Sequence, residues 1–243
     1  MKLEVWAEIK PSPNRGKIVE TARAIKDFVD YIDVPEAPMG IPKAHSIAVA
    51  AVIRYEVGVK CIANIRLLDI NTNGLISLAG AALLLGLEGI VLLRGDPPAY
   101  GKPVMDIGTE DAIRILKSNR RLKELRIGAI LSLARDYHKR LEIPADFFLV
   151  TRLWKPSQLE NEAIRSFRLK GGKIIPYIVV AEKDEKKHLY LLLKGHQPVF
   201  EPAEAAEFTR KLVGLVDGVL VSAPLSSKTL VEAVKAVRDL NRQ

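Results

Sequence analysis

Charged side chains follow the most strand-like apolar run of the chain, and their types could bind an anion or stabilise a positive charge. Residues 90–93 are branched aliphatic, and Arg94, Gly95 and Asp96 follow them before two prolines. Such a run is typical of a strand buried on both faces, and glycine lets a bound molecule approach the backbone closely. The prolines fix the exit of the chain, so we expect the Asp96 carboxylate to project beyond the strand end. A plain surface turn that opens at Asp96 is the alternative.

A glutamate near the N-terminus is the second candidate for chemistry. In residues 3–9 aliphatic side chains alternate with others, so Glu8 faces away from the aliphatic side at the C-terminal end of the expected strand. Desolvation in a partly closed site raises the pKa of a carboxyl group, which lets it donate a proton. Other polar side chains stand where further expected strands end: Asn64, Arg66, Thr151 and Arg152.

Strands and helices alternate along the chain, and these elements must position the candidate residues. The strand signals lie at residues 3–9, 31–34, 59–65, 90–93, 127–131, 146–151, 173–179 and 218–222. Helical patterns separate them, so the strands are expected to run parallel with helical crossovers. The helical patterns include a short helix expected near Arg135 to Leu141 and a helix expected to begin near Ser157, which forms a capping-box pattern with Glu160. This α/β pattern over 243 residues favours a closed (β/α)8 TIM barrel, formed by residues 1–243 as a single domain. The candidates then lie at the C-terminal strand ends, where barrels of this type place catalytic groups.

The segment at residues 182–202 is longer than the other connections. It carries a run of mixed charges and separates two helical patterns. A lid over the site is one interpretation of this segment, and an ordinary surface excursion is the other.

Composition and charge exclude several classes of protein. The net charge is +8, from 37 Lys and Arg against 29 Asp and Glu. Basic residues cluster only at residues 117–126, which a solvated helix end explains, so we expect no nucleic-acid partner. A positive field instead favours an anionic small molecule. The single cysteine, Cys61, suits a reducing compartment, and no apolar stretch is long enough to span a bilayer. We therefore expect a cytoplasmic protein without a membrane partner.

The run at residues 90–98, Ile-Val-Leu-Leu-Arg-Gly-Asp-Pro-Pro, resembles the Leu-Arg-Gly-Asp-Pro-Pro signature of the methylenetetrahydrofolate reductase family. The similarity is specific mainly from Asn64 to Pro98, and Glu8 in Ala-Glu-Ile-Lys-Pro resembles the proposed acid catalyst of that family. The resemblance implies a flavoprotein oxidoreductase of one-carbon metabolism, which reduces a methylene-pterin, either a folate or a modified pterin, to the methyl form. The implied cofactors are FAD or FMN, with NAD(P)H as the hydride donor.

The resemblance also implies a role for each candidate residue. Glu8 would donate a proton to a pterin nitrogen, and Asp96 would stabilise the resulting iminium cation. The flavin pocket would be lined by Asn64, Arg94, Gly95 and Asp96, and the substrate would be bound by Thr151 and Arg152. No metal site is expected. One alternative is a pterin-binding accessory protein without its own flavin or redox step, and a homo-oligomer or partner subunit is left open. Another is an unrelated barrel enzyme in which Arg-Gly-Asp-Pro-Pro is coincidental.

Overall fold

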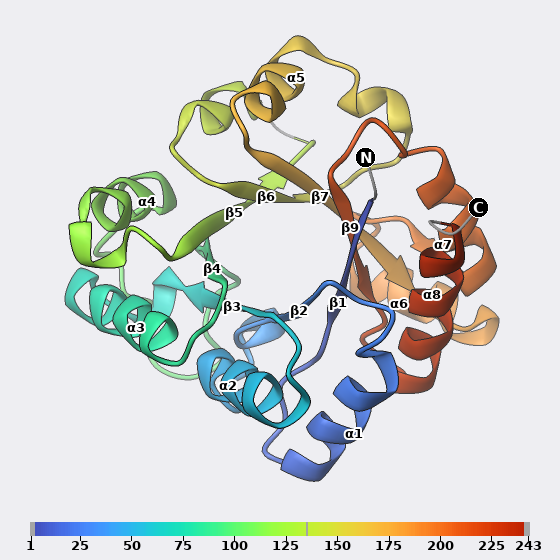
Figure 1. Ribbon diagram of the computed structural model, residues 1–243, viewed down its shortest axis with the longest axis horizontal. Helices are drawn as coiled ribbons and strands as arrows, with labels where there is room; N and C mark the ends of the chain where they lie inside the picture. The colour runs from blue at the N-terminus through green and yellow to red at the C-terminus, as the bar shows by residue number, and fades with distance from the viewer. Residues whose placement is uncertain (1–2, 135, 241–243) are drawn as a thin grey trace.

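A closed ring of parallel strands forms the centre of the molecule (Figure 1). The computed structural model describes residues 3–134 and 136–240. The ring runs from β1 through β2, β3, β4, β5, β6, β7 and β9 back to β1, and every neighbouring pair is parallel. The ring strands are β1 (Glu4–Glu8), β2 (Tyr31–Val34), β3 (Cys61–Arg66), β4 (Gly89–Leu93), β5 (Arg126–Ser132), β6 (Phe147–Thr151), β7 (Lys173–Val180) and β9 (Gly218–Ser222). The prediction of a single-domain (β/α)8 TIM barrel is confirmed.

Helices cover the outside of this ring (Figure 1). The α-helices are α1 (Arg15–Ile25), α2 (Ser46–Val57), α3 (Thr72–Leu84), α4 (Thr109–Ser118), α5 (Glu162–Leu169), α6 (Lys183–Leu192), α7 (Pro202–Arg210) and α8 (Ser227–Leu240). Short 3-10 helices lie at η1 (Pro38–Gly40), η2 (Leu67–Asp69), η3 (Arg120–Leu122), η4 (His138–Glu142) and η5 (Pro156–Leu159). No helix among the described residues combines the length and the apolar character needed to cross a membrane.

Each strand sends alternate side chains to two different cores, as the period of a β-strand requires. In β1, Val5 and Ala7 belong to the large core between the strands and the helices. Trp6 points the other way, into a smaller core inside the barrel, and is fully buried. Its ring centroid lies 4.7 Å from that of Tyr31 and 5.3 Å from that of Phe147. Glu8, two positions after Trp6, therefore faces the barrel interior.

Charged side chains occupy the N-terminal end of the barrel interior. The Glu4 carboxylate accepts a hydrogen bond from the Lys173 ammonium at 2.5 Å, and the Arg126 guanidinium lies over the Tyr31 and Phe147 rings. These side chains lie below the aromatic layer around Trp6, so the aromatic layer separates them from the C-terminal ends of the strands. The polar side chains at the C-terminal ends form a second, independent group.

The connections differ from the sequence predictions in three places. The helix expected from Arg135 begins at a position outside the described residues, and the following segment forms η4. The helix expected to begin near Ser157 begins at Glu162, because the Asn161 side chain accepts a hydrogen bond from the Ile164 amide and caps it there. The long segment 182–202 forms α6 and a short strand, β8 (Val199–Phe200), which pairs with the end of β7.

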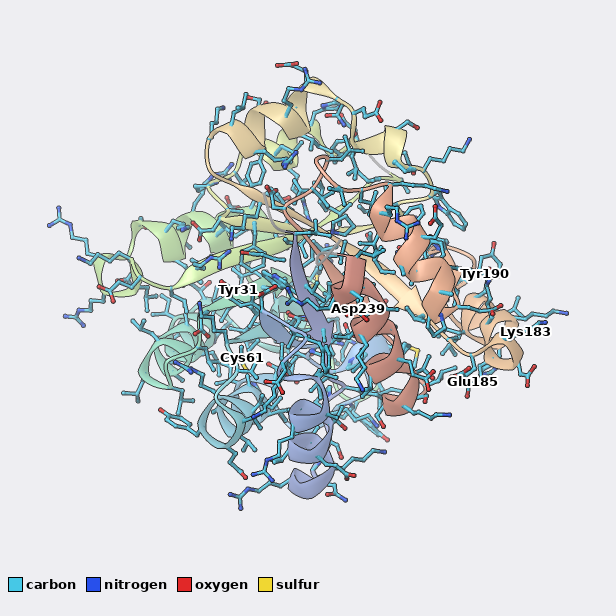
Figure 2. All side chains as sticks on the ribbon, turned by 45° about the vertical axis from the view of Figure 1, so that its right-hand side comes forward. Tyr31, Cys61, Lys183, Glu185, Tyr190 and Asp239 are labelled. Atoms are coloured by element: carbon cyan, nitrogen blue, oxygen red, sulfur yellow. The ribbon has the colours of Figure 1, made fainter. Side chains whose placement is uncertain are left out.

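The segment 182–202 is therefore anchored to the barrel wall through β8. Lys183 and Tyr190 of α6 lie at the outer edge of the molecule (Figure 2). Helix α6 is thus a surface excursion, whereas the tip of the segment reaches the strand ends, where the Gln197 side chain accepts a hydrogen bond from the Arg152 backbone amide.

Candidate active site at the barrel mouth

Five polar side chains face the barrel interior near the C-terminal ends of their strands. They come from five strands, and they are Glu8, Asp33, Asn64, Tyr177 and Ser222. Glu8 and Asp33 are register partners on the neighbouring strands β1 and β2. Because adjacent strands lie about 4.8 Å apart and both side chains face inward, the two carboxyl groups are neighbours. The fold thus brings together two acids that are 25 positions apart in the chain.

Glu8 and Tyr177 are the half-buried members of this group, and Glu8 is the one that lines a cavity. The cavity has a volume of about 320 Å³ and lies at the C-terminal end of β1. The Oε1 atom of Glu8 accepts a hydrogen bond from the Ser222 hydroxyl at 2.7 Å. Burial raises the pKa of Glu8, and the hydroxyl groups of Ser222 and Tyr177 together with the charge of Lys10 offset part of that rise. Glu8 therefore holds its proton to a higher pH than an exposed glutamate does.

Asp33 lies beside Glu8 and is fully buried. One carboxyl oxygen, Oδ2, accepts a long hydrogen bond of 3.4 Å from the Asn64 amide, and Oδ1 has no hydrogen-bond partner. Burial raises the pKa of Asp33 well above its usual range, and the negative charge of Glu8 raises it further. The two acids therefore titrate as a coupled pair in which Asp33 is the more strongly protonated member.

Tyr177 reaches this pair from β7. Burial raises its pKa well above the usual range, and the Asp33 and Glu8 charges add to the effect. The phenol is therefore neutral and can donate a hydrogen bond to the Glu8 carboxylate. Its backbone carbonyl accepts a hydrogen bond from the side-chain amide of Gln197 at 3.2 Å.

On the opposite side, apolar side chains face the barrel interior just below Ser132 and Thr151, which end β5 and β6. Leu93, Ile130 and Leu149 belong to the barrel core on β4, β5 and β6. Leu93 and Ile130 remain half-buried. A bound molecule thus meets an acidic, hydroxyl-rich side of the mouth and, on the other side, two hydroxyl residues above an apolar layer that can hold a carbon skeleton.

Asp33 and Tyr177 were not predicted as site residues, although the alternation of side chains that predicts Glu8 is also present in their strands. Asp33 is the only charged residue of the otherwise apolar strand 31–34, and it stands two positions after the inward-facing Tyr31. Tyr177 stands two positions after the inward-facing Ile175. The alternation that singled out Glu8 would therefore have identified both residues.

The coupled acids make the stability of the protein depend on pH in a predictable direction. The pKa of Asp33 is higher in the folded chain than in the unfolded chain, where it is about 3.9. The folded chain therefore binds the extra proton, and stability falls as the pH rises from the unfolded pKa to the folded pKa. We expect Asp33→Asn to remove this part of the decline, so the variant gains stability relative to the parent as the pH rises.

Urea unfolding of the parent and of Asp33→Asn from pH 4 to pH 8 measures this effect. Asp27→Asn, which changes an exposed carboxylate, is the matched control and should run parallel to the parent. An Asp33→Asn curve that stays parallel to the parent would show that Asp33 titrates normally.

Arg66 connects the loops after β2 and β4, and this connection explains the Arg-Gly-Asp-Pro-Pro run. Its side chain is buried, and its guanidinium donates to the carbonyl oxygens of Ala37 at 2.8 Å and of Asp96 at 2.9 Å. Its Nε also lies 2.8 Å from the Asp69 carboxylate. Gly95 has a φ of +84°, and a side chain there would press on Arg66.

The Asp96 backbone, rather than its carboxylate, makes the contact with Arg66. The side chains of Asp96 and Arg94 are exposed, and the Arg94 guanidinium contacts the Met105 sulfur at 3.4 Å. Gly40 packs against the Pro97 carbonyl, and the Ala99 amide donates to the Gly40 carbonyl at 2.9 Å. The run at residues 94–98 is thus shaped by packing between two loops.

The other sequence candidates lie at the mouth but outside the cavity that Glu8 lines. The Asn64 side chain is buried against Asp33, so it belongs to the acid layer. Thr151 ends β6 next to Ser132 of β5. Arg152 has a φ of 63°, a strained conformation for a side-chain-bearing residue, and the Gln197 side chain accepts its amide hydrogen at 2.5 Å.

The residues expected to hold a flavin do not come together around the Glu8 cavity. Neither Asn64, Arg94, Gly95 nor Asp96 lines it. Asn64 is engaged in the acid layer, whereas Arg94 and Asp96 are exposed on the loop after β4. These four residues do not line one common cavity with Glu8, and we assign no chemical step to a flavin.

Comparisons with known proteins give a fold and no family. No protein-family model matches the sequence, and no curated protein matches it significantly. Orotidine 5'-phosphate decarboxylase from Pyrococcus horikoshii has a similar structure, with 13% identity over 96% of this chain and 99% of that chain and a TM-score of 0.58. A chain of tryptophan synthase from M. tuberculosis has 13% identity over 99% of this chain and 90% of that chain, with a TM-score of 0.59.

The likeness is that of a TIM barrel. Sequence identity this low shows the fold alone, since one barrel fold supports many unrelated chemistries. The expected membership of the methylenetetrahydrofolate reductase family is wrong, because the similar structures belong to other barrel families. The motif that suggested it has a different physical explanation. Arg66 and Gly40 constrain the loop that contains Gly95 and Pro97 through backbone contacts.

Proposed function

We propose that this protein is an enzyme that transfers a proton to or from a small molecule bound at the barrel mouth, with Glu8 as the general acid and base. One observation carries the proposal: Glu8 is half-buried on a cavity and has a raised pKa, beside the fully buried acid Asp33. Strongly shifted carboxyl groups in a cleft are typical of catalytic sites. Their position at the C-terminal strand ends is where TIM-barrel enzymes carry out their chemistry.

The roles of the neighbouring groups follow from their contacts. Protonated Glu8 donates its proton to the substrate atom, and the carboxylate that remains is stabilised by hydrogen bonds from Ser222 and Tyr177. Asp33 stays neutral beneath Glu8, which avoids two adjacent negative charges. In the reverse direction the Glu8 carboxylate accepts a proton from the substrate. Asp33, Ser222 and Tyr177 are therefore positioning residues, and Glu8 is the catalytic residue.

Deuterium exchange across a range of compounds tests the proposal and identifies the substrate in the same experiment. The protein is incubated in D₂O with a panel of small phosphorylated and carboxylated compounds, and mass spectrometry follows deuterium uptake and new products. We expect at least one compound to change with the parent protein and not with Glu8→Gln. Equal conversion by the two proteins would contradict the assignment of Glu8.

The reduction of a methylene-pterin with a flavin and NAD(P)H, or pterin binding without a redox step, remains a second prediction. The raised pKa of Glu8 is the property that a proton donor to a pterin nitrogen needs. The visible spectrum of the purified protein tests it, because a bound oxidised flavin is yellow and is bleached by NAD(P)H. A colourless protein that does not bind a pterin would rule out both forms of this prediction.

A further inference from the structure

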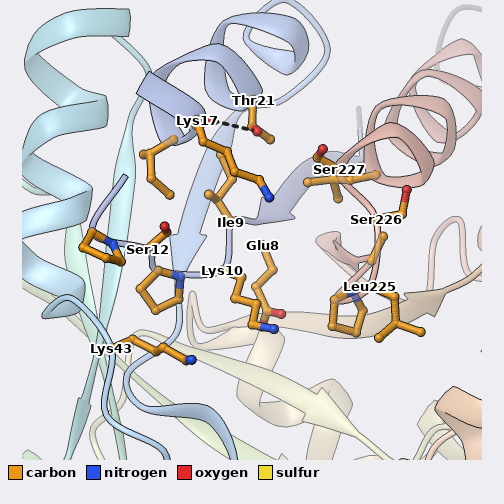
Figure 3. Close-up of a pocket in the computed structure, with 16 residues that line it drawn as sticks. Glu8, Ile9, Lys10, Ser12, Lys17, Thr21, Lys43, Leu225, Ser226 and Ser227 are labelled. Carbon is orange, nitrogen blue, oxygen red and sulfur yellow. Dashed lines mark hydrogen bonds between the residues drawn. The ribbon is translucent and has the colours of Figure 1, made fainter. Parts of the chain in front are cut away.

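The cavity beside Glu8 lies between the loops after β1 and β9. Figure 3 shows its lining, which includes Glu8 and the ends of α1 and α8. Its volume is about 320 Å³, which is far larger than the single group that would exchange a proton with Glu8. A molecule bound there would therefore have one part at Glu8 and another part farther along the cavity. The groups in that second part indicate what the molecule carries.

Three lysines line the cavity, and Lys10 is the one whose charge acts on Glu8. Lys10 comes from the loop after β1, Lys17 from the first turns of α1, and Lys43 from the loop before α2. Their side chains extend into the cavity from different directions (Figure 3). Within the described part of the chain, none of the three forms an ion pair with a carboxylate within 4.0 Å. They create a positive field that a bound anion would neutralise.

The beginning of α8 adds hydrogen-bond donors to the same wall. Ser226 caps the helix, since its side-chain oxygen accepts from the Thr229 amide at 3.2 Å and its carbonyl accepts from the Leu230 amide at 3.1 Å. The amides of the first helical turn have no partner within an α-helix, and the Ser226 and Ser227 side chains also line the cavity. Serine hydroxyls and helix amides are common ligands of phosphate oxygens.

We propose that this cavity binds the phosphoryl group of a small phosphorylated substrate, which places the rest of the substrate at Glu8. The inference rests on the proposed acid–base function, because it names the substrate class of the same site. Three ammonium groups beside serine hydroxyls and helix amides suit the double negative charge and three terminal oxygens of a phosphoryl group better than the single charge and two oxygens of a carboxylate. The remaining volume holds the carbon skeleton between the lysines and Glu8.

Calorimetric titration with inorganic phosphate, at constant ionic strength in chloride buffer, tests the subsite. The parent should bind phosphate more tightly than acetate. The double variant Lys17→Gln/Lys43→Gln should weaken phosphate binding by about tenfold or more, which corresponds to about 1.4 kcal/mol. Lys26→Gln, at the other end of α1, is the matched control and should bind like the parent. The double arginine variant at positions 17 and 43 should retain binding, which separates loss of charge from loss of fold.

Two results would overturn the subsite: a parent that binds phosphate no better than acetate, or a double glutamine variant that binds it as tightly as the parent. Glu8→Gln distinguishes this failure from failure of the proposed function. It should keep phosphate binding and lose turnover. If Glu8→Gln stops turnover while the double glutamine variant still binds phosphate like the parent, the acid–base function stands and the phosphoryl subsite is wrong.

Discussion

Glu8→Gln is expected to lower the turnover of the substrate found by deuterium exchange by about 10²–10⁴-fold, the usual contribution of a general acid or base. Glutamine keeps the size of the side chain and can still accept the 2.7 Å hydrogen bond from Ser222. It cannot gain or lose a proton. The variant should therefore fold like the parent and lose the limb of the pH–rate profile that Glu8 controls. Because burial raises the pKa of Glu8, that limb should lie above the range of an ordinary glutamate.

The control for this experiment is Glu20→Gln, which changes an exposed glutamate of α1 and should keep the turnover of the parent. A Glu8→Gln variant with the same pH–rate profile as the parent would show that another group transfers the proton. Asp96→Asn in the same assay tests the remaining sequence prediction that the Asp96 carboxylate takes part in catalysis. A large loss of turnover in that variant would support a role for the loop after β4.

Arg66→Met is expected to destabilise the fold by about 2–5 kcal/mol. The buried Arg66 guanidinium holds the carbonyl oxygens of Ala37 and Asp96, and the variant leaves both without that donor. Each buried acceptor left unsatisfied costs about 1–3 kcal/mol. Thermal and urea unfolding measure the loss. The matched control is Arg94→Met, because Arg94 is exposed on the next strand end, and its removal should change stability by less than about 0.5 kcal/mol.

Comparable stabilities of the two arginine variants would refute the structural explanation of the 94–98 run. The expected difference has a second consequence. If Arg66 holds this loop through the Asp96 carbonyl, Arg66→Met should increase hydrogen exchange at residues 94–99 and at the loop around Gly40. Arg94→Met should leave the exchange in both loops unchanged.

The barrel could be predicted from the sequence because its signal is repeated in every unit. The expected strands at 31–34 and 218–222 coincide with β2 and β9, and the others differ from the observed strands by only a few residues at their ends. Local capping was harder to assign, because Ser157 and Asn161 both offer capping side chains and only Asn161 caps α5. Such competition is decided by how the helix packs against the strands.

The candidate site could be predicted only in part. Alternation within one strand was enough to place Glu8 inside the barrel mouth, since side-chain direction in a strand depends only on position. Its neighbours depend on the parallel register of β1 with β2 and on the closure of the ring, which place Asp33 beside it. The lysines of the cavity lie in loops without a regular pattern, so no sequence period could reveal that they converge.

The sequence by itself determined the α/β class, the order of the strands and the inward direction of Glu8, because local periodicity fixes these properties. Only the tertiary structure decided which polar residues are neighbours, because long-range strand pairing and loop packing set those distances. It also decided the meaning of the Arg-Gly-Asp-Pro-Pro run. That run has the composition of a binding loop, but the loop packs through its backbone against Arg66 and Gly40, and its charged side chains face solvent.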